Sequence, residues 1–65
     1  MKTRLGELRR KNRISQRELA RQLHISQTSV SKYERDAAEP DLSMTLEMAR
    51  FFGVSVDYFL YNSGN

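Results

Sequence analysis

The sequence predicts a small all-α protein, and two observations support this prediction. Apolar residues recur at intervals of three and four along most of the chain, and no stretch shows the sustained alternation typical of strands. In addition, four residues of the types that cap helix N-termini stand directly before these apolar stretches: Ser15, Ser26, Asp41 and Ser55. Together with a first helix near the N-terminus, they predict five helices in one domain of 65 residues.

The first helix is expected to bury Leu5 and Leu8. We expect it to end near Asn12, because asparagine tolerates the left-handed conformation that often follows a helix. Gly6 lies inside this helix, where glycine costs about 1 kcal/mol relative to alanine.

The tripeptide Ile-Ser-Gln occurs twice, beginning at Ile14 and at Ile25. In each copy the serine is expected to cap a helix, while the isoleucine packs the start of that helix against the core. Glu18 has the spacing to complete a capping box by reaching back to Ser15. The interval between the copies leaves room for about two helical turns and a turn of three or four residues. The pattern therefore predicts a helix-turn-helix at about residues 16–35.

The stretch "RDAAEPD" is expected to be a loop, because Pro40 disfavours helix just before it. Gly53 is expected to end the fourth helix, and a last short helix follows, which places the C-terminal helices at about residues 42–61. Apolar residues at helical spacing are expected to form the core: Leu5, Leu8, Leu19, Ala20, Leu23, Ile25, Val30, Leu42, Leu46, Ala49, Phe52, Val54 and Leu60.

Charge divides the chain into two halves. Residues 1–35 carry ten Lys/Arg and three Asp/Glu, a net charge of +7. Residues 36–65 carry one arginine and five acids, a net charge of −4. This division suggests that the first half faces a polyanion and that the second half has another role; the alternative is that the basic half is only a solvated surface.

The composition argues against several classes of protein. The chain has no cysteine and one histidine, so neither a disulfide framework nor a metal site is expected. No apolar run approaches the ~20 residues of a membrane span, and no secretory leader is evident. No spacing of Ser, His and Asp suggests a catalytic triad. We therefore expect a cytoplasmic protein that is not an enzyme and binds no cofactor.

Taken together, these residues resemble the phage repressor and Cro family, also called Xre-type helix-turn-helix proteins. The resemblance covers about residues 4–60 and rests on the joint occurrence of several short pieces: Leu8-Arg9, Ser15-Gln16, Glu18-Leu19-Ala20, Ile25-Ser26, Val30-Ser31, Tyr33-Glu34, Pro40, Ala49 and Gly53-Val54-Ser55-Val56-Asp57. It implies a compact five-helix bundle, the lambda-repressor-like DNA-binding domain, that binds operator DNA as a dimer.

This chain departs from the family at three points. His24 and Asp36 stand where the family often has glycine, and both positions are expected to adopt positive φ. We expect His24 to be a turn residue and not a switch. The loop after the motif is acidic here, at Asp36 and Glu39, which argues against phosphate contacts from it.

The second helix of such a motif places its N-terminal side chains against base edges in the major groove. Gln27 can pair with adenine, Lys32 with guanine, and the Thr28 methyl group can touch thymine. The residues expected to contact bases are Gln27, Thr28, Ser31 and Lys32.

The preceding helix crosses the DNA backbone, so Gln16 and Arg17 at its start are expected to contact phosphate. Arg10, Lys11 and Arg13 flank the end of the first helix and extend this expected footprint. The resemblance also implies an ion pair between Arg9 and Glu34 that orients the helix facing the bases.

The resemblance implies a sequence-specific transcriptional regulator, in the simplest form a small repressor that binds a palindromic operator on double-stranded DNA as a homodimer. The alternative is an antitoxin or adaptor module whose main partner is another protein, which the acidic half favours. A dimer interface is expected at Tyr58, Phe59 and Tyr61, with Phe59 shared with the core, unless these aromatic residues only close the core of one copy.

Overall fold

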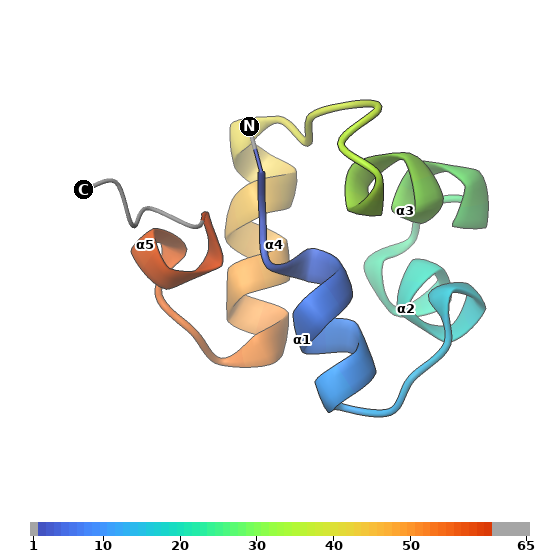
Figure 1. Ribbon diagram of the computed structural model, residues 1–65, viewed down its shortest axis with the longest axis horizontal. Coiled ribbons are helices and arrows are strands. Elements are labelled where there is room, and N and C mark those ends of the chain that lie inside the picture. The colour runs from blue at the N-terminus through green and yellow to red at the C-terminus, as the bar shows by residue number, and fades with distance from the viewer. Residues whose placement is uncertain (1, 61–65) are drawn as a thin grey trace.

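A computed structural model describes residues 2–60 of the chain (Figure 1). It contains five helices: α1 (Leu5–Lys11), α2 (Gln16–Leu23), α3 (Gln27–Glu34), α4 (Leu42–Phe52) and α5 (Val56–Phe59). No strand occurs in this part of the chain. The pair α2 and α3 lies at one end of the longest axis, and α4 and α5 lie toward the other end, with α1 between them (Figure 1). The all-α fold predicted from the sequence is confirmed.

The N-termini of the last four helices lie where the capping residues predict them. In each case a side-chain oxygen accepts a hydrogen bond from the backbone N–H three residues later, at 2.8–3.1 Å. The four capping residues are Ser15, Ser26, Asp41 and Ser55. Each bond satisfies an amide that the helix itself leaves without a partner.

The reciprocal half of the predicted capping box is wrong. Glu18 does not reach back to Ser15; its carboxylate instead accepts hydrogen bonds from Arg21 at 2.7 and 3.1 Å and from Gln22 at 2.8 Å. Two donors one turn along the same helix offer more to the carboxylate than one backbone amide does, and the arginine adds charge.

Three residues other than glycine adopt positive φ within residues 2–60: Arg13 at 59°, His24 at 60° and Asp36 at 60°. The left-handed conformations predicted for His24 and Asp36 are confirmed, as is that of Gly53 at 69°. The predicted end of α1 near Asn12 is confirmed, but the left-handed conformation lies one residue later, at Arg13, because φ of Asn12 is −90°. The Asn12 amide instead donates to the carbonyl of Leu8 at 2.7 Å, which caps the last turn of α1.

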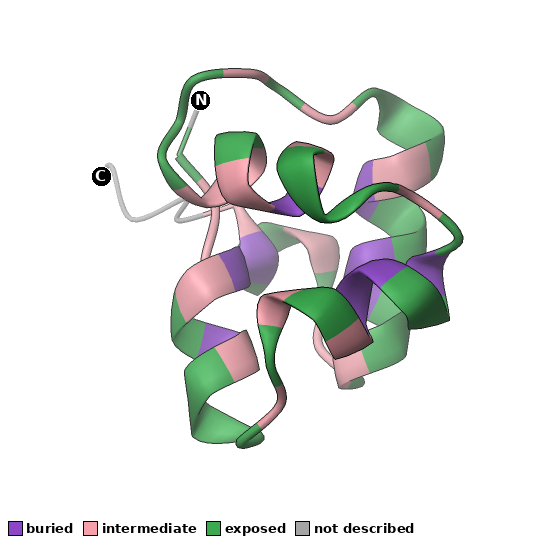
Figure 2. Cartoon of the chain, turned by 90° about the vertical axis from the view of Figure 1, so that its right-hand side faces the viewer, coloured by how far each residue is buried: buried purple, intermediate pink, exposed green. Residues whose placement is uncertain are grey.

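The core fills the space between the five helices. In Figure 2 the buried segments lie on sides of the helices that face one another, while exposed segments face outward. The fully buried apolar residues come from every helix: Leu5, Leu8, Leu19, Ala20, Leu23, Val30, Met48, Ala49 and Phe59. Four further predicted core residues pack half-buried against them: Ile25, Phe52, Val54 and Leu60.

The predicted inner face of α4 is confirmed at Ala49 and Phe52 and wrong at the two leucines. Leu42 and Leu46, expected in the core, are 72% and 41% exposed. Thr45 and Met48 are buried in their place, beside Ala49. The helix is therefore rotated about its axis from the predicted orientation. Met48 is wholly buried, and its flexible unbranched side chain can adapt to the space between the helices.

Arg4 joins the N-terminal segment to α5, a contact that the sequence did not predict. Its backbone N–H donates to the carbonyl of Phe59 at 2.8 Å, and its side-chain Nε donates to the carbonyl of Tyr58 at 2.6 Å. The guanidinium lies 4.3 Å from the centroid of the Tyr58 ring. A helix as short as α5 is marginal alone, so this contact fixes its position.

Candidate nucleic-acid interface

Four polar side chains surround one shallow hollow at the N-terminal ends of α2 and α3. Its volume is about 260 Å³, and it is lined by Gln16, Gln27, Thr28 and Ser31. Three of the four residues expected to contact bases lie in this "polar hollow", together with one expected to contact phosphate. The fold thus gathers residues from both motif helices on one surface.

The first turn of α3 presents its side chains to solvent. Gln27 and Thr28 follow the capping residue Ser26 directly, and both are exposed. Ser31 is half-buried, and its hydroxyl oxygen accepts a hydrogen bond from Nε of Arg35 at 3.3 Å. Lys32 is exposed but lies outside the polar hollow, further along α3.

Gln16 connects the polar hollow to the far end of α3. Its Nε2 group donates a hydrogen bond to Oε1 of Glu34 at 3.0 Å. A glutamine amide has two N–H groups, and this bond uses one of them. The contact therefore fixes which side of the amide faces Glu34 and leaves the second N–H for another acceptor.

Glu34 is held on its other side by Arg9 of α1. Nε and Nη2 of Arg9 both donate to the carboxylate, the latter at 3.2 Å, while Nη1 donates to the carbonyl of Ile14 at 2.9 Å. The side chains of Arg9 and Glu34 are only 15% and 8% exposed. One carboxylate thus joins α1, α2 and α3, an arrangement we call the Glu34 network (Arg9, Gln16 and Glu34).

The close approach of α1 to this network explains a glycine inside a helix. A Cβ atom at Gly6 would lie 3.4 Å from the carboxyl group of Glu34 and 3.1 Å from the guanidinium of Arg10. A Cβ atom alone would be in ordinary contact with this carboxylate, and the exposed Arg10 side chain could move aside. A side chain that extends beyond Cβ would press on the Glu34 network.

The cations expected to contact phosphate are exposed but dispersed. Arg17 follows Gln16 at the start of α2, and Arg13 forms the left-handed turn before it. No ion pair engages either residue within the described part of the chain. Arg10 lies apart, in a separate hollow of about 360 Å³ between α1 and the C-terminal end of α3.

The outer face of α2 carries an ion pair of its own. Hydrogen bonds from Arg21 and then from Gln22 lower the pKa of the Glu18 carboxyl to about 2, and the same contact raises the pKa of Arg21. Arg21 is therefore engaged with Glu18, unlike Arg13 and Arg17.

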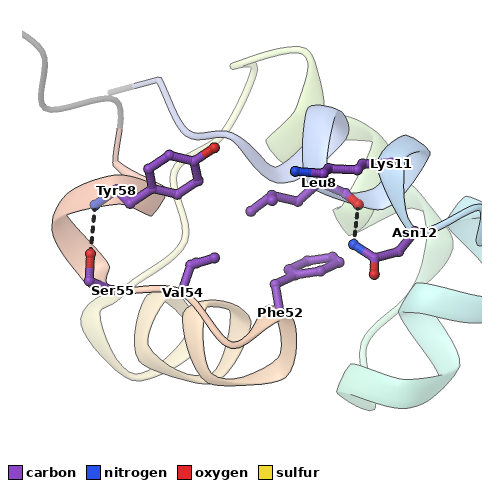
Figure 3. A pocket seen from close by; sticks show the side chains of 7 residues that line it. All are labelled: Leu8, Lys11, Asn12, Phe52, Val54, Ser55 and Tyr58. Atoms are coloured by element: carbon purple, nitrogen blue, oxygen red, sulfur yellow. Dashed lines mark hydrogen bonds between the residues drawn. The ribbon is translucent and has the colours of Figure 1, made fainter.

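Another hollow lies at the junction of the two halves, between the end of α1, the end of α4 and α5 (Figure 3). Its volume is about 540 Å³. Leu8, Phe52 and Val54 give it an apolar lining, and Lys11 stands on the α1 side (Figure 3). None of the residues expected to contact bases lines it.

Of the residues expected at a dimer interface, one is buried, one is partly exposed and one lies outside the described residues. Phe59 is wholly buried in the chain's own core, so the prediction that it is shared with a partner is wrong. The ring of Tyr58 is partly exposed, although the guanidinium of Arg4 lies over one side of it. Tyr61 lies outside the described residues.

Residues 2–60 contain neither a candidate metal site nor a candidate membrane-spanning helix. No group of three or more His, Cys, Asp or Glu side chains is arranged there to hold a metal ion. None of the helices in the same range has the length and apolarity that crossing a membrane requires.

Comparisons with known proteins identify the family of this chain. A helix-turn-helix family model matches residues 5–59. The chain is 40% identical over 57 residues to the HTH-type transcriptional regulator ImmR of Bacillus subtilis, covering 88% of this chain and 45% of that protein. It is 34% identical over 56 residues to the HTH-type transcriptional activator BcrR of Enterococcus faecalis, covering 86% of this chain and 28% of that protein.

A third relative has nearly the same length. An uncharacterized HTH-type transcriptional regulator of Methanocaldococcus jannaschii is 32% identical over 62 residues, which cover 94% of both chains. By contrast, the chain spans about half the length of the two Bacillus subtilis relatives that it matches. The family model, these relatives and the helix-turn-helix of α2 and α3 lead to one conclusion: the chain belongs to the helix-turn-helix family of the phage repressor and Cro type.

Proposed function

We propose that this protein is a sequence-specific DNA-binding transcriptional regulator, a small repressor that binds a palindromic operator as a homodimer. The observation that carries the proposal is the polar hollow, where Gln16 from α2 meets Gln27, Thr28 and Ser31 from α3. The net charge of +7 on residues 1–35 supports a polyanionic partner. The relatives' printed names describe regulators, and the family is not one of enzymes.

In this proposal α3 enters the major groove with its first turn leading. The exposed Gln27 amide pairs with the N6 and N7 groups of an adenine, and the Thr28 methyl group touches a thymine methyl. Lys32, one turn further along, donates to a guanine. Ser31 adds a shorter contact from the half-buried edge of the hollow.

Gln16 has a different role in this proposal. One of its amide N–H groups is held by Glu34, so the second can donate to a phosphate oxygen beside the N-terminus of α2. Arg17 and Arg13 add charge to the same backbone contact, and Arg10 lies at the edge of the footprint. The Glu34 network then fixes α3 at a set distance from the phosphate that Gln16 binds.

The test is selection of binding sites from a random DNA pool, followed by titration of the best site. Gln27→Ala and Lys32→Ala should each cost about 1–3 kcal/mol on that site and relax the preference at particular base pairs. Gln16→Ala should weaken binding to all sequences about equally, because phosphate contacts carry no sequence information. A Gln27→Ala variant with unchanged affinity and consensus would contradict the assignment of α3.

Gln22→Ala provides a matched control. Gln22 is also an exposed glutamine on α2, but it bonds Glu18 and lies outside the polar hollow. We expect this variant to bind DNA as the parent does. A loss equal to that of Gln16→Ala would show that any change on α2 weakens binding, and that the phosphate contact is not specific to Gln16.

The salt dependence of binding separates this proposal from the alternative, an antitoxin or adaptor whose main partner is a protein. The exposed Leu42 and Leu46 in the acidic half are the observation that favours the alternative. For a DNA-binding regulator, log K against log salt should fall by about 0.9 for each phosphate neutralised. A flat dependence would favour the protein partner.

A further inference from the structure

The side chain of Arg35, the residue directly after α3, folds back onto that helix. Its Nε group donates a hydrogen bond to the hydroxyl oxygen of Ser31 at 3.3 Å. Long side chains on a helix point toward its N-terminus, so the guanidinium lies beside the turn that carries Ser31. Arg35 is not among the residues that the sequence led us to expect at the DNA, yet this bond brings it to a residue that lines the polar hollow.

Arg35 also continues a row of polar side chains along α3. Gln27, Ser31 and Arg35 are spaced by four residues, so they lie on the same side of the helix. The first two line the polar hollow. In the proposed function this side of α3 faces the major groove, and Arg35 therefore faces the groove together with Ser31.

The bond from Arg35 determines what Ser31 can offer to DNA. A serine hydroxyl has one O–H donor and an oxygen that accepts. The oxygen accepts from Arg35, while the O–H itself has no acceptor within residues 2–60. The hydrogens of a base amino group carry positive partial charge, so the guanidinium opposes their approach to the same oxygen. Toward DNA, the Ser31 hydroxyl is therefore a donor.

Arg35 adds donors and no acceptor. A guanidinium has five N–H groups, and the bond to Ser31 uses one of them. Arg35 also borders the hollow that holds Arg10, but no carboxylate pairs with it in the part of the chain that the structure describes. Its Nη groups can therefore donate to a partner outside the chain. We call Ser31 and Arg35 the donor pair.

The bases differ in how well they fit two adjacent donors. In the major groove guanine presents two acceptors side by side, N7 and O6. Adenine presents N7 beside an amino group, cytosine presents an amino group, and thymine presents one acceptor beside a methyl group. A surface that offers only donors is therefore matched by guanine and opposed by the amino groups of adenine and cytosine.

We propose that the donor pair recognises one guanine in each half-site of the DNA. The inference rests on the proposed function and adds the base that this part of α3 recognises. The Ser31 hydroxyl donates to one acceptor of the guanine and an Nη group of Arg35 donates to the other. The bond between the two side chains holds these donors at a fixed separation, so each residue depends on the other.

A phosphate oxygen is the other acceptor that DNA offers to Arg35. An arginine that binds the DNA backbone from the end of α3 has to extend away from the hollow. The bond to Ser31 favours the base instead, because it holds the guanidinium next to a residue of the polar hollow.

Replacement of single guanines by 7-deazaguanine tests the proposal, because it removes the N7 acceptor and keeps base pairing. In the best site selected from a random DNA pool, one such replacement in each half-site should weaken binding of the parent about fivefold. Ser31→Ala and Arg35→Ala should each abolish this sensitivity and the preference for guanine at that position. Lys32→Ala is the matched control: it removes a donor from the same helix outside the polar hollow, and it should keep the sensitivity. If Ser31→Ala keeps it as well, the proposal is overturned.

Arg35→Lys separates geometry from charge. Lysine keeps the positive charge but lacks the planar fork that joins Ser31 to a second acceptor. We expect binding to keep the parent's salt dependence, while the preference for guanine over adenine at that position falls about fivefold. An unchanged preference would show that Arg35 contributes charge alone, and the proposal would be overturned.

Methylphosphonate substitution of single phosphates provides the last comparison. If Arg35→Ala abolishes the sensitivity to one methylphosphonate and keeps the sensitivity to 7-deazaguanine, Arg35 binds the backbone and the proposal is overturned. A consensus that depends on Gln27 but contains no guanine that depends on Ser31 would overturn this inference alone. If the parent selects no consensus, the proposed function fails, and the inference fails with it.

Discussion

The helices α2 and α4 differ in the side chains that they leave exposed. In α2 the buried residues are Leu19, Ala20 and Leu23, while the outer face is polar and carries the Glu18–Arg21 ion pair. In α4 the buried residues are Thr45, Met48 and Ala49, whereas Leu42 and Leu46 are exposed along one flank of the helix. The outer face of α2 is therefore polar, whereas α4 leaves some apolar surface uncovered on its flank.

The same difference extends to the two halves. In the basic half the Glu34 network fixes three helices by polar contacts and leaves side chains free at the polar hollow. In the acidic half α5 is held by the burial of Phe59 and by Arg4, and leucines remain outside. This contrast supports the proposal that the first half is the one that contacts DNA.

The largest effect is expected from Phe59, where the acidic half is anchored. Phe59→Ala should cost about 3–5 kcal/mol of unfolding free energy, because the side chain is wholly buried. Domains are stable by only about 5–15 kcal/mol, so this variant should be largely unfolded or close to it. Tyr58→Ala, next to it but partly exposed, should cost far less in urea unfolding. If the two variants lost the same unfolding free energy, the difference in burial between Phe59 and Tyr58 would not explain how much each contributes to stability.

The next effect concerns the basic half. Arg9→Met should cost about 3 kcal/mol in urea unfolding, because it leaves the nearly buried Glu34 carboxylate without its cation. Combining Arg9→Met with Glu34→Met should recover most of that loss, since no buried charge then remains unpaired. The double variant should still show a broadened set of selected DNA sites, because the bonds from Arg9 to Glu34 that tie α3 to α1 are gone.

These two readouts separate stability from orientation. If the double variant regained both stability and site selectivity, the Glu34 network would be dispensable for placing α3. If it regained neither, the network would hold the fold together and its role at the DNA interface would remain unsupported.

The parts of this fold that depend on local hydrogen bonds could be predicted from the sequence. A capping serine or a residue in a left-handed turn acts within three or four residues, which is why Ser15, Ser26 and His24 were placed correctly. The inner face of α4 could not be predicted in this way. Its apolar spacing fits two faces that share Ala49 and Phe52, and packing against the rest of the core selects between them.

The candidate site shows the same limit. The positions of Gln27 and Thr28 follow from the start of α3 alone. The bond from Gln16 to Glu34 joins residues 18 positions apart, and its existence depends on how α2 crosses the end of α3. The contact of Arg4 with Tyr58 spans 54 positions, and no feature of the sequence near either residue indicates it.

The smallest effect is expected at the Glu18–Arg21 ion pair on α2, because this pair is exposed whereas Arg9 and Glu34 are nearly buried. Bonding by Arg21 and then Gln22 lowers the pKa of Glu18 from 4.5 to about 2. A carboxyl with a lowered pKa in the folded state stabilises the protein above pH 4.5, and this contribution is lost as the pH falls toward about 2. Glu18→Gln should therefore make the unfolding free energy decline less steeply between about pH 4.5 and 2. The change should be small, because solvent screens an exposed pair.

Arg21→Gln should reduce the same decline of unfolding free energy, since it removes the principal donor to Glu18. Added salt should narrow the difference between parent and variants. A large, salt-independent effect of Glu18→Gln would mean that the outer face of α2 holds the fold together, and the contrast with α4 would then have to be redrawn.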